Sequence, residues 1–178
     1  MGNLLFSPSG RINSNEFMKG ATFLVLVTFV LGLLPIISLA LGLLQIVTFV
    51  FIWCWIVLWV KRYHDGGKSG WMCLLPIIVY LVVVSIASVL VSGMFVDADA
   101  AAAATEAATE AAEAGDIAAV FKLALSGGGG VTKMGVFATA AVGAAVSYGI
   151  AFLFNNMIKG DEHENQYGPN GSAANAFD

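Results

Sequence analysis

Charged residues are scarce in this sequence. Asp, Glu, Lys and Arg make up 11% of the 178 residues, whereas a soluble domain averages about 25%. Hydrophobic residues reach 58%. With so little charge the chain cannot cover a globular core with a polar surface. The composition therefore excludes an ordinary soluble domain and indicates an integral membrane protein.

Several chemical signatures are also missing. The sequence has no HExxH or related metal-ligand spacing. It also has no Ser or Cys nucleophile together with a base and a second group that would orient that base. Cys54 and Cys73 lie in apolar runs without a CxxC motif, so we expect buried thiols rather than the alternative, a disulfide or metal pair. No basic stripe carries interleaved aromatic residues, which argues against nucleic acid as a partner. We therefore expect no enzyme activity, no catalytic residue, no cofactor and no metal.

The first long apolar run is uncharged from residue 20 to residue 60. As one helix it would measure about 60 Å at 1.5 Å per residue, twice the thickness of a bilayer core of about 30 Å. Two antiparallel spans are therefore predicted, at about 14–34 and 42–62. Asn13 and Glu16 have the spacing of a helix capping box, and Pro35 is expected to end the first helix.

Aromatic residues cluster near the end of the second predicted span, at Trp53, Trp55, Trp59 and Tyr63. Tryptophan and tyrosine favour the membrane interface, so they can mark the exit from the bilayer. The alternative is that some of them pack inside the helix bundle. The sequence leaves both possibilities open.

Two further spans are predicted at about 71–96 and 133–158. The last of these repeats small residues at four-residue intervals, at Gly135, Thr139, Gly143 and Ser147. Such a face lets helices approach closely, either inside the bundle or against a partner. A homo-oligomer or another membrane protein is therefore a candidate partner.

The segment 97–132 differs from the rest of the chain. It is rich in alanine, which favours a helix, and it carries Glu106, Glu110 and Glu113 on one helical face. We expect a helix outside the bilayer with a solvated acidic face, followed by a glycine hinge at 126–130. The tail 159–178 is polar, and we expect it to be cytoplasmic.

The distribution of basic residues predicts the orientation. With four spans, one side of the membrane holds both termini and the central turn, together with Arg11, Lys19, Lys61, Arg62, Lys68 and Lys159. The other side holds only Lys122 and Lys133, among six acids. The positive-inside rule then places both termini and the central turn in the cytoplasm.

The central turn is the most distinctive segment, running from Lys61 to Met72. It contains His64 directly followed by Asp65, which raises the question of a histidine base oriented by a carboxylate. Adjacent residues on a helix do not face each other, so this pairing needs a non-helical turn. We favour a structural role, with Asp65 or Ser69 as a cap for the next helix. Binding of anionic lipid head groups by the basic residues is the alternative.

Three sequence pieces resemble a bacterial family of small inner-membrane proteins known as domain of unknown function 805. Phe6, Gly10-Arg11 and Glu16-Phe17 are similar to its N-terminal motif. The stretch from Lys61 to Trp71 resembles its R-R-L-H-D-x-x-[KR]-S-G-W-W signature, with Tyr63 and Met72 as departures. The run 165–170 is similar to its closing N-x-[YF]-G-P motif. The segment 97–132 is outside the family pattern, so its role cannot be inherited from the family.

The resemblance implies a compact helical domain in the bacterial inner (plasma) membrane and assigns no activity. Because all three pieces are predicted on the cytoplasmic side, we expect them to form one polar cluster that contacts structure, lipid or a partner. Its members are Arg11, Glu16, Lys61, Arg62, His64, Asp65, Lys68, Ser69, Trp71, Asn165 and Tyr167.

The predicted fold is an all-α, polytopic helix bundle: one membrane domain over 1–178 with four transmembrane helices and an extracytoplasmic alanine-rich helix. The predicted function is a structural or partner-binding membrane module. The alternatives are a small transporter or channel component, and an anionic-lipid-binding protein of the membrane stress response.

Overall fold

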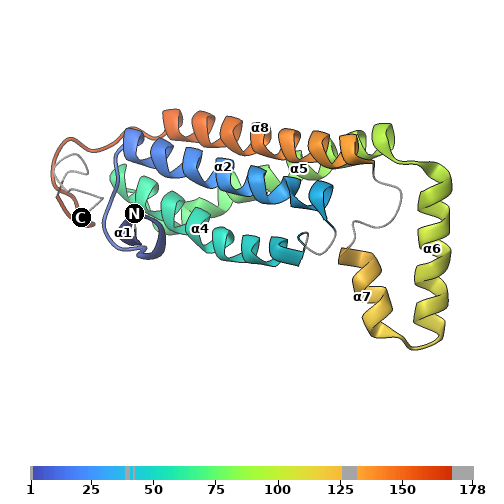
Figure 1. The fold of residues 1–178 in the computed structure, drawn as a ribbon. Helices are drawn as coiled ribbons and strands as arrows, with labels where there is room; N and C mark the ends of the chain where they lie inside the picture. The colour runs from blue at the N-terminus through green and yellow to red at the C-terminus, as the bar shows by residue number, and fades with distance from the viewer. Residues whose placement is uncertain (1, 39–40, 42, 126–131, 170–178) are drawn as a thin grey trace. The chain divides into compact units, whose positions relative to one another are not determined.

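The computed structural model describes residues 2–38, 41, 43–125 and 132–169 (Figure 1). Within these residues every regular element is a helix and no β-strand occurs, which confirms the predicted all-α class. The elements are α1 (Gly2–Phe6), α2 (Ser14–Ile37), the 3-10 helix η1 (Leu43–Val47), α4 (Thr48–Asp65), the 3-10 helix η2 (Gly70–Cys73), α5 (Leu74–Phe95), α6 (Ala98–Glu113), α7 (Ile117–Leu125) and α8 (Lys133–Met157).

Three helical segments are long and apolar enough to cross a membrane. They are Ser14–Ile37, Gly70–Phe95 and Lys133–Met157, and they correspond to the predicted spans 14–34, 71–96 and 133–158. Helix α4, which corresponds to the predicted span 42–62, carries Lys61, Arg62 and Asp65 in its last turns and is not among the three. The total of four spans therefore stays a prediction.

The two ends of α2 show how far local sequence rules hold. At its start, the Asn13 N–H donates to Glu16 Oε2 at 3.3 Å and the Glu16 N–H donates to Asn13 Oδ1 at 2.9 Å, so the predicted capping box is confirmed. The prediction that Pro35 ends the helix is wrong, because α2 continues through it to Ile37. A proline inside a helix removes its own N–H bond and crowds the carbonyl four residues earlier, but the backbone continues past it, and the Ser38 N–H bonds to the Leu34 carbonyl at 3.2 Å.

The contacts divide the chain into two compact units. Unit 1 comprises Met1–Thr28, Val47–Val84 and Ala144–Asp178, and unit 2 comprises Phe29–Ile46 and Ser85–Gly143. Unit 1 contains all of the described residues that were predicted to form the polar cluster.

The core of unit 1 is aromatic and aliphatic. Phe17 of α2 packs on Trp59 of α4 with ring centroids 4.5 Å apart, and Phe154 of α8 meets Trp59 edge-on at 6.1 Å. Trp59 and Tyr63 are buried, whereas Trp53 is 48% exposed. Trp59 and Tyr63 therefore pack inside the bundle, which is the second of the two predicted alternatives. Both cysteines are buried free thiols, as predicted.

Unit 2 contains the alanine-rich segment, which forms two helices instead of the single helix predicted. The Asp97 side chain caps α6 by accepting from the backbone N–H groups of Asp99 and Ala100. Gly115, with φ of 72°, then breaks the helix, and the Asp116 side chain caps α7 by accepting from the Ala119 N–H at 2.9 Å. The left-handed conformation suits glycine and interrupts an otherwise favourable helical sequence. Glu106, Glu110 and Glu113 are exposed, and the predicted glycine hinge lies outside the described residues.

Candidate functional site

A cluster of buried charges lies at the C-terminal end of α4. Arg62 and Asp65 are separated by three positions and therefore share one helix face. The Arg62 Nη1 atom donates to Asp65 Oδ2 at 2.6 Å. Both side chains are almost completely shielded from solvent, with residue exposures of 2% and 3%. This pair is formed by the local helix geometry alone.

The N-terminal segment adds a third charge. Gly10 has a φ of 83°, a left-handed conformation in the turn that precedes Arg11. The Ile12 N–H donates to the carbonyl of Lys61 at 3.4 Å and ties this segment to α4. Arg11 Nε then donates to Asp65 Oδ1 at 2.9 Å. We refer to Arg11, Arg62 and Asp65 as the buried charge cluster. Both oxygens of its carboxylate are occupied, each by a different arginine.

The segment that follows α8 closes the cluster. Arg11 also donates to the carbonyls of Asp161 and His163, and Arg62 donates to the carbonyls of Asn155 and Ile158. The last carbonyls of a helix have no partner within the helix, so a guanidinium placed there satisfies them. In addition, the Asp161 N–H donates to the Asp65 carbonyl at 2.7 Å. The cluster therefore joins three segments that are far apart in sequence.

Asn155 is a central member of this site that the sequence analysis missed. Its Oδ1 atom accepts from Arg62 Nε, and its Nδ2 atom donates to Ser14 Oγ at 2.8 Å. It is 2% exposed and links the ends of α8, α4 and α2. The available signal was an asparagine pair, Asn155 and Asn156, at the end of an apolar run. Nothing in that signal separates the buried asparagine from the exposed one.

We expect Asn155→Ala to destabilise the folded protein by about 1–3 kcal/mol, because Arg62 would keep a buried donor without its acceptor. The measurement is the thermal unfolding of the purified protein in a mild detergent. The neighbouring Asn156→Ala is the matched control, since Asn156 is exposed and its side chain donates to the Phe152 carbonyl of its own helix. Equal melting temperatures for the two variants would contradict this role of Asn155.

A second layer of contacts surrounds the cluster on the tail side. The rings of His64 and Tyr167 stack with centroids 3.7 Å apart and an interplanar angle of 4°. Asn165 Nδ2 donates to the His64 carbonyl at 3.0 Å and to Asp161 Oδ2 at 2.9 Å. The closing motif of the sequence is thereby held against the central turn. Asn170, at the end of that motif, lies outside the described residues.

His64 is oriented by the backbone and not by its neighbour Asp65. Its Nδ1 atom lies 3.1 Å from the Gly10 carbonyl oxygen, which can only accept, so Nδ1 carries the proton. Burial lowers the pKa of His64 below its ordinary value of about 6.5, and the bond to Gly10 opposes this shift. His64 is therefore neutral at pH 7. The arrangement of a histidine base held by Asp65 is not formed, because both carboxylate oxygens bond to arginines.

The other predicted site residues divide into two groups. Glu16 and Lys61 are buried, with Glu16 in the capping box and close enough to attract the Lys61 charge. Lys68, Ser69 and Trp71 are exposed and lie outside the charge cluster. The expectation that Ser69 or Asp65 caps the next helix is wrong: Ser69 makes no side-chain capping bond, and Asp65 is committed to the arginines. The N–H donors of Arg11 and Arg62 occupy the Asp65 carboxylate in place of the N–H groups at the next helix start.

The cluster is fully satisfied by the chain itself. Among the described residues, no buried side-chain nitrogen or oxygen lacks a hydrogen-bond partner. Gly160 also packs directly on the carboxylate, since a β-carbon at that position would lie 2.4 Å from Asp65 Oδ2. A carboxylate held between two arginines and covered by backbone is suited to fixing segments together. It offers no open position for a substrate.

The fold and this site define an all-helical protein with three helices able to cross a membrane, in which buried charges tie both ends of the chain to a central turn. The chain belongs to the family described as Protein of unknown function (DUF805), whose model matches residues 5–169. The resemblance of the three sequence pieces is thereby confirmed. No curated protein and no solved structure matches the sequence.

Proposed function

We propose that this protein is a multi-pass protein of the bacterial inner membrane that acts without enzymatic activity, as a structural or partner-binding module. The observation that carries the proposal is the complete internal pairing of Asp65 with Arg11 and Arg62. Catalytic groups need access to a reacting atom, whereas these groups contact only the chain. Their role in the proposal is to hold the helix ends together so that the rest of the module presents a constant surface.

The proposed topology has four spans, with both termini and the central turn in the cytoplasm. Direct bonds from Arg11 to Asp65 and to the carbonyl of His163 support it, because segments in contact lie on the same side of a membrane. An even number of crossings must then separate the N-terminus from the central turn, and the central turn from the tail. In this proposal α4 serves as the second crossing, and its charged residues lie at the cytoplasmic end.

Two other functions are less well supported. A proton-coupled transporter usually has ionisable groups within its spans, but the sequence has no Asp, Glu, Lys or Arg between Lys19 and Lys61, or between Lys68 and Asp97. Recognition of anionic lipid by the basic turn is weakened because Lys61 and Arg62 are buried. Of the three bases in that turn, Lys68 is the exposed one.

Single-cysteine labelling tests the proposed topology. We expect a membrane-impermeant maleimide added to intact spheroplasts to label Glu110→Cys and to spare Lys68→Cys, with the opposite pattern in inverted vesicles. Both positions are exposed, and the unmodified protein supplies the background because Cys54 and Cys73 are buried. Labelling of both variants from the same side would overturn the proposal.

A further inference from the structure

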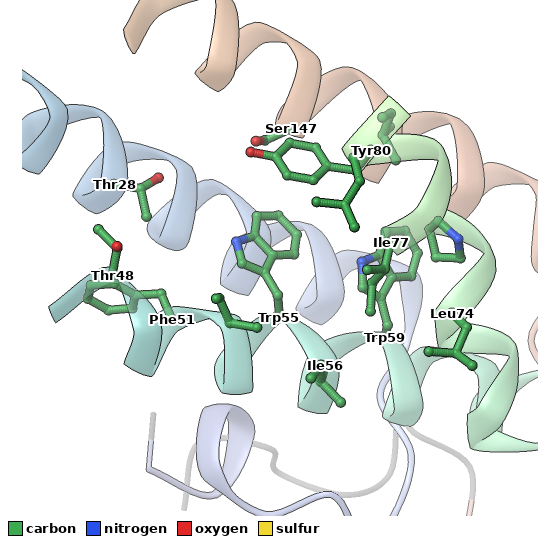
Figure 2. Close-up of a pocket in the computed structure, with 14 residues that line it drawn as sticks. Thr28, Thr48, Phe51, Trp55, Ile56, Trp59, Leu74, Ile77, Tyr80 and Ser147 are labelled. Atoms are coloured by element: carbon green, nitrogen blue, oxygen red, sulfur yellow. The ribbon is translucent and has the colours of Figure 1, made fainter. Parts of the chain in front are cut away.

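Unit 1 contains an apolar cavity of about 620 Å³, formed mainly by residues of α4 and α5 (Figure 2). One residue of α2 and two of α8 complete its lining. The wall on the α4 side is largely aromatic, with Phe51, Trp55 and Trp59 in sequence along the helix. The buried charge cluster does not contribute to it, so this is a separate feature of the molecule.

The cavity lies at membrane depth. Thr28, Tyr80 and Ser147 each belong to one of the three segments that can cross a bilayer, and all three line the cavity. Its floor includes the buried residues Trp59 and Ile150, whereas Ile52 and Leu81 on its rim are each 54% exposed. In a bilayer, exposed side chains at this depth face lipid. The cavity is therefore open to the hydrocarbon phase.

The dimensions restrict what can fill the cavity. Along α4 it extends from Thr48 to Trp59, about 16 Å at 1.5 Å per residue. This is about half of the 30 Å hydrocarbon core, the depth of one leaflet. A cavity of this length that opens to the hydrocarbon phase suits one acyl chain of a leaflet, lying along α4.

The position of the cavity selects the leaflet. Its lining on α5 begins at Leu74, directly after the η2 turn, where Trp71 is 79% exposed. An exposed tryptophan at the start of a span is typical of the head-group level. The cavity thus runs from the interface on the side of the charge cluster toward the middle of the bilayer. At its deep end the Thr28 hydroxyl donates to the Leu24 carbonyl at 2.8 Å, so this group does not oppose an apolar occupant.

We propose that the cavity is a binding site for one acyl chain of a phospholipid from the leaflet on the side of the charge cluster. The chain lies along the aromatic wall of α4 and the ester and head group stay near Trp71. Van der Waals contacts between the chain and the aromatic lining supply the binding energy, because the chain exchanges one apolar environment for another. This site goes beyond the proposed function and rests on one part of it, the crossing of the membrane by α4.

The test is the lipid content of the protein in detergent. Native mass spectrometry is expected to show one retained phospholipid on the unmodified protein. Ser147→Phe, which places a ring in the cavity, should reduce retention by about tenfold. Ala145→Phe is the matched control, because Ala145 lies on the same helix but is exposed, and it should retain the lipid. Absence of lipid from the unmodified protein, or equal retention by the two variants, would overturn the inference.

A second measurement covers the case in which Ser147→Phe fails to fold. In the double variant Trp53→Phe/Trp71→Phe, the remaining tryptophans are Trp55 and Trp59, and both line the cavity. A phospholipid brominated on its acyl chain, added to this variant in detergent, should quench the fluorescence with saturation at one lipid per protein. Quenching that increases with lipid concentration without saturating would argue against the site. So would quenching by a brominated free fatty acid but not by the brominated phospholipid. Neither result depends on the labelling that tests the topology.

Discussion

Replacing Asp65 by alanine is expected to destabilise the folded protein by about 3–5 kcal/mol, because removal of one partner from a buried ion pair leaves an uncompensated buried charge. Here two charges would remain. Arg11 and Arg62 are 5% and 2% exposed, and each donates to one oxygen of the same carboxylate. Without that carboxylate the two guanidinium groups would repel each other inside the protein.

The measurement is the yield of monodisperse protein in detergent together with its melting temperature. Asp65→Asn should be nearly as damaging, since it preserves the shape of the side chain and removes the charge. Glu110→Ala is the control, because Glu110 is exposed on α6 and an exposed substitution changes stability by about 0.5 kcal/mol or less. If Asp65→Ala had the same melting temperature as the unmodified protein, the cluster would not be the link between the helix ends.

Replacing Gly160 by alanine should destabilise the protein by about 1–3 kcal/mol through steric overpacking. The new β-carbon would lie 2.4 Å from Asp65 Oδ2 and 3.2 Å from its Cγ. Real β-carbons do not come this close, so the carboxylate or the tail backbone must move. Asp65 is held on its other side by Arg11 and Arg62 and cannot yield without lengthening those bonds.

Gly149→Ala provides the matched comparison, because Gly149 lies in α8 and a β-carbon there would meet nothing within 4 Å. Since alanine is a better helix former by about 1 kcal/mol, this variant should be neutral or slightly more stable. Limited proteolysis adds a second readout, and we expect faster cleavage of the tail in Gly160→Ala. A Gly160→Ala protein with normal melting and normal cleavage would show that the tail does not need its close approach to Asp65.

The helical fold and the membrane character could be predicted from the sequence, because both depend on patterns within short stretches. An uncharged run from residue 20 to residue 60 is incompatible with a soluble surface. The capping box of Asn13 and Glu16 involves residues separated by three positions, so the sequence alone indicates it. The family motifs, in turn, pointed to Arg11, Arg62, Asp65 and Asn165 as members of one cluster.

Other features depended on residues distant in sequence. Arg62 meets Asn155 and Arg11 meets the tail carbonyls only when α2, α4 and α8 are packed. The sequence could not distinguish buried Asn155 from exposed Asn156, or show that Lys61 is buried while Lys68 is exposed. The role of Gly160 is also invisible locally, because its neighbour Asp65 comes from another segment.

By itself, the sequence determined that this protein is helical, apolar enough for a membrane, and built around a charged turn. It also showed that this turn and two further motifs, one before it and one after it, resemble the same family. Only the tertiary structure decided how that turn is used. A carboxylate next to a histidine suggests a base when read along the chain. In the folded protein two arginines occupy both oxygens of Asp65, so the charges hold the chain ends together. The reason is that a buried charge is stabilised only by paired and hydrogen-bonded partners. Tertiary packing brings those partners together, and it is not a local property of the chain.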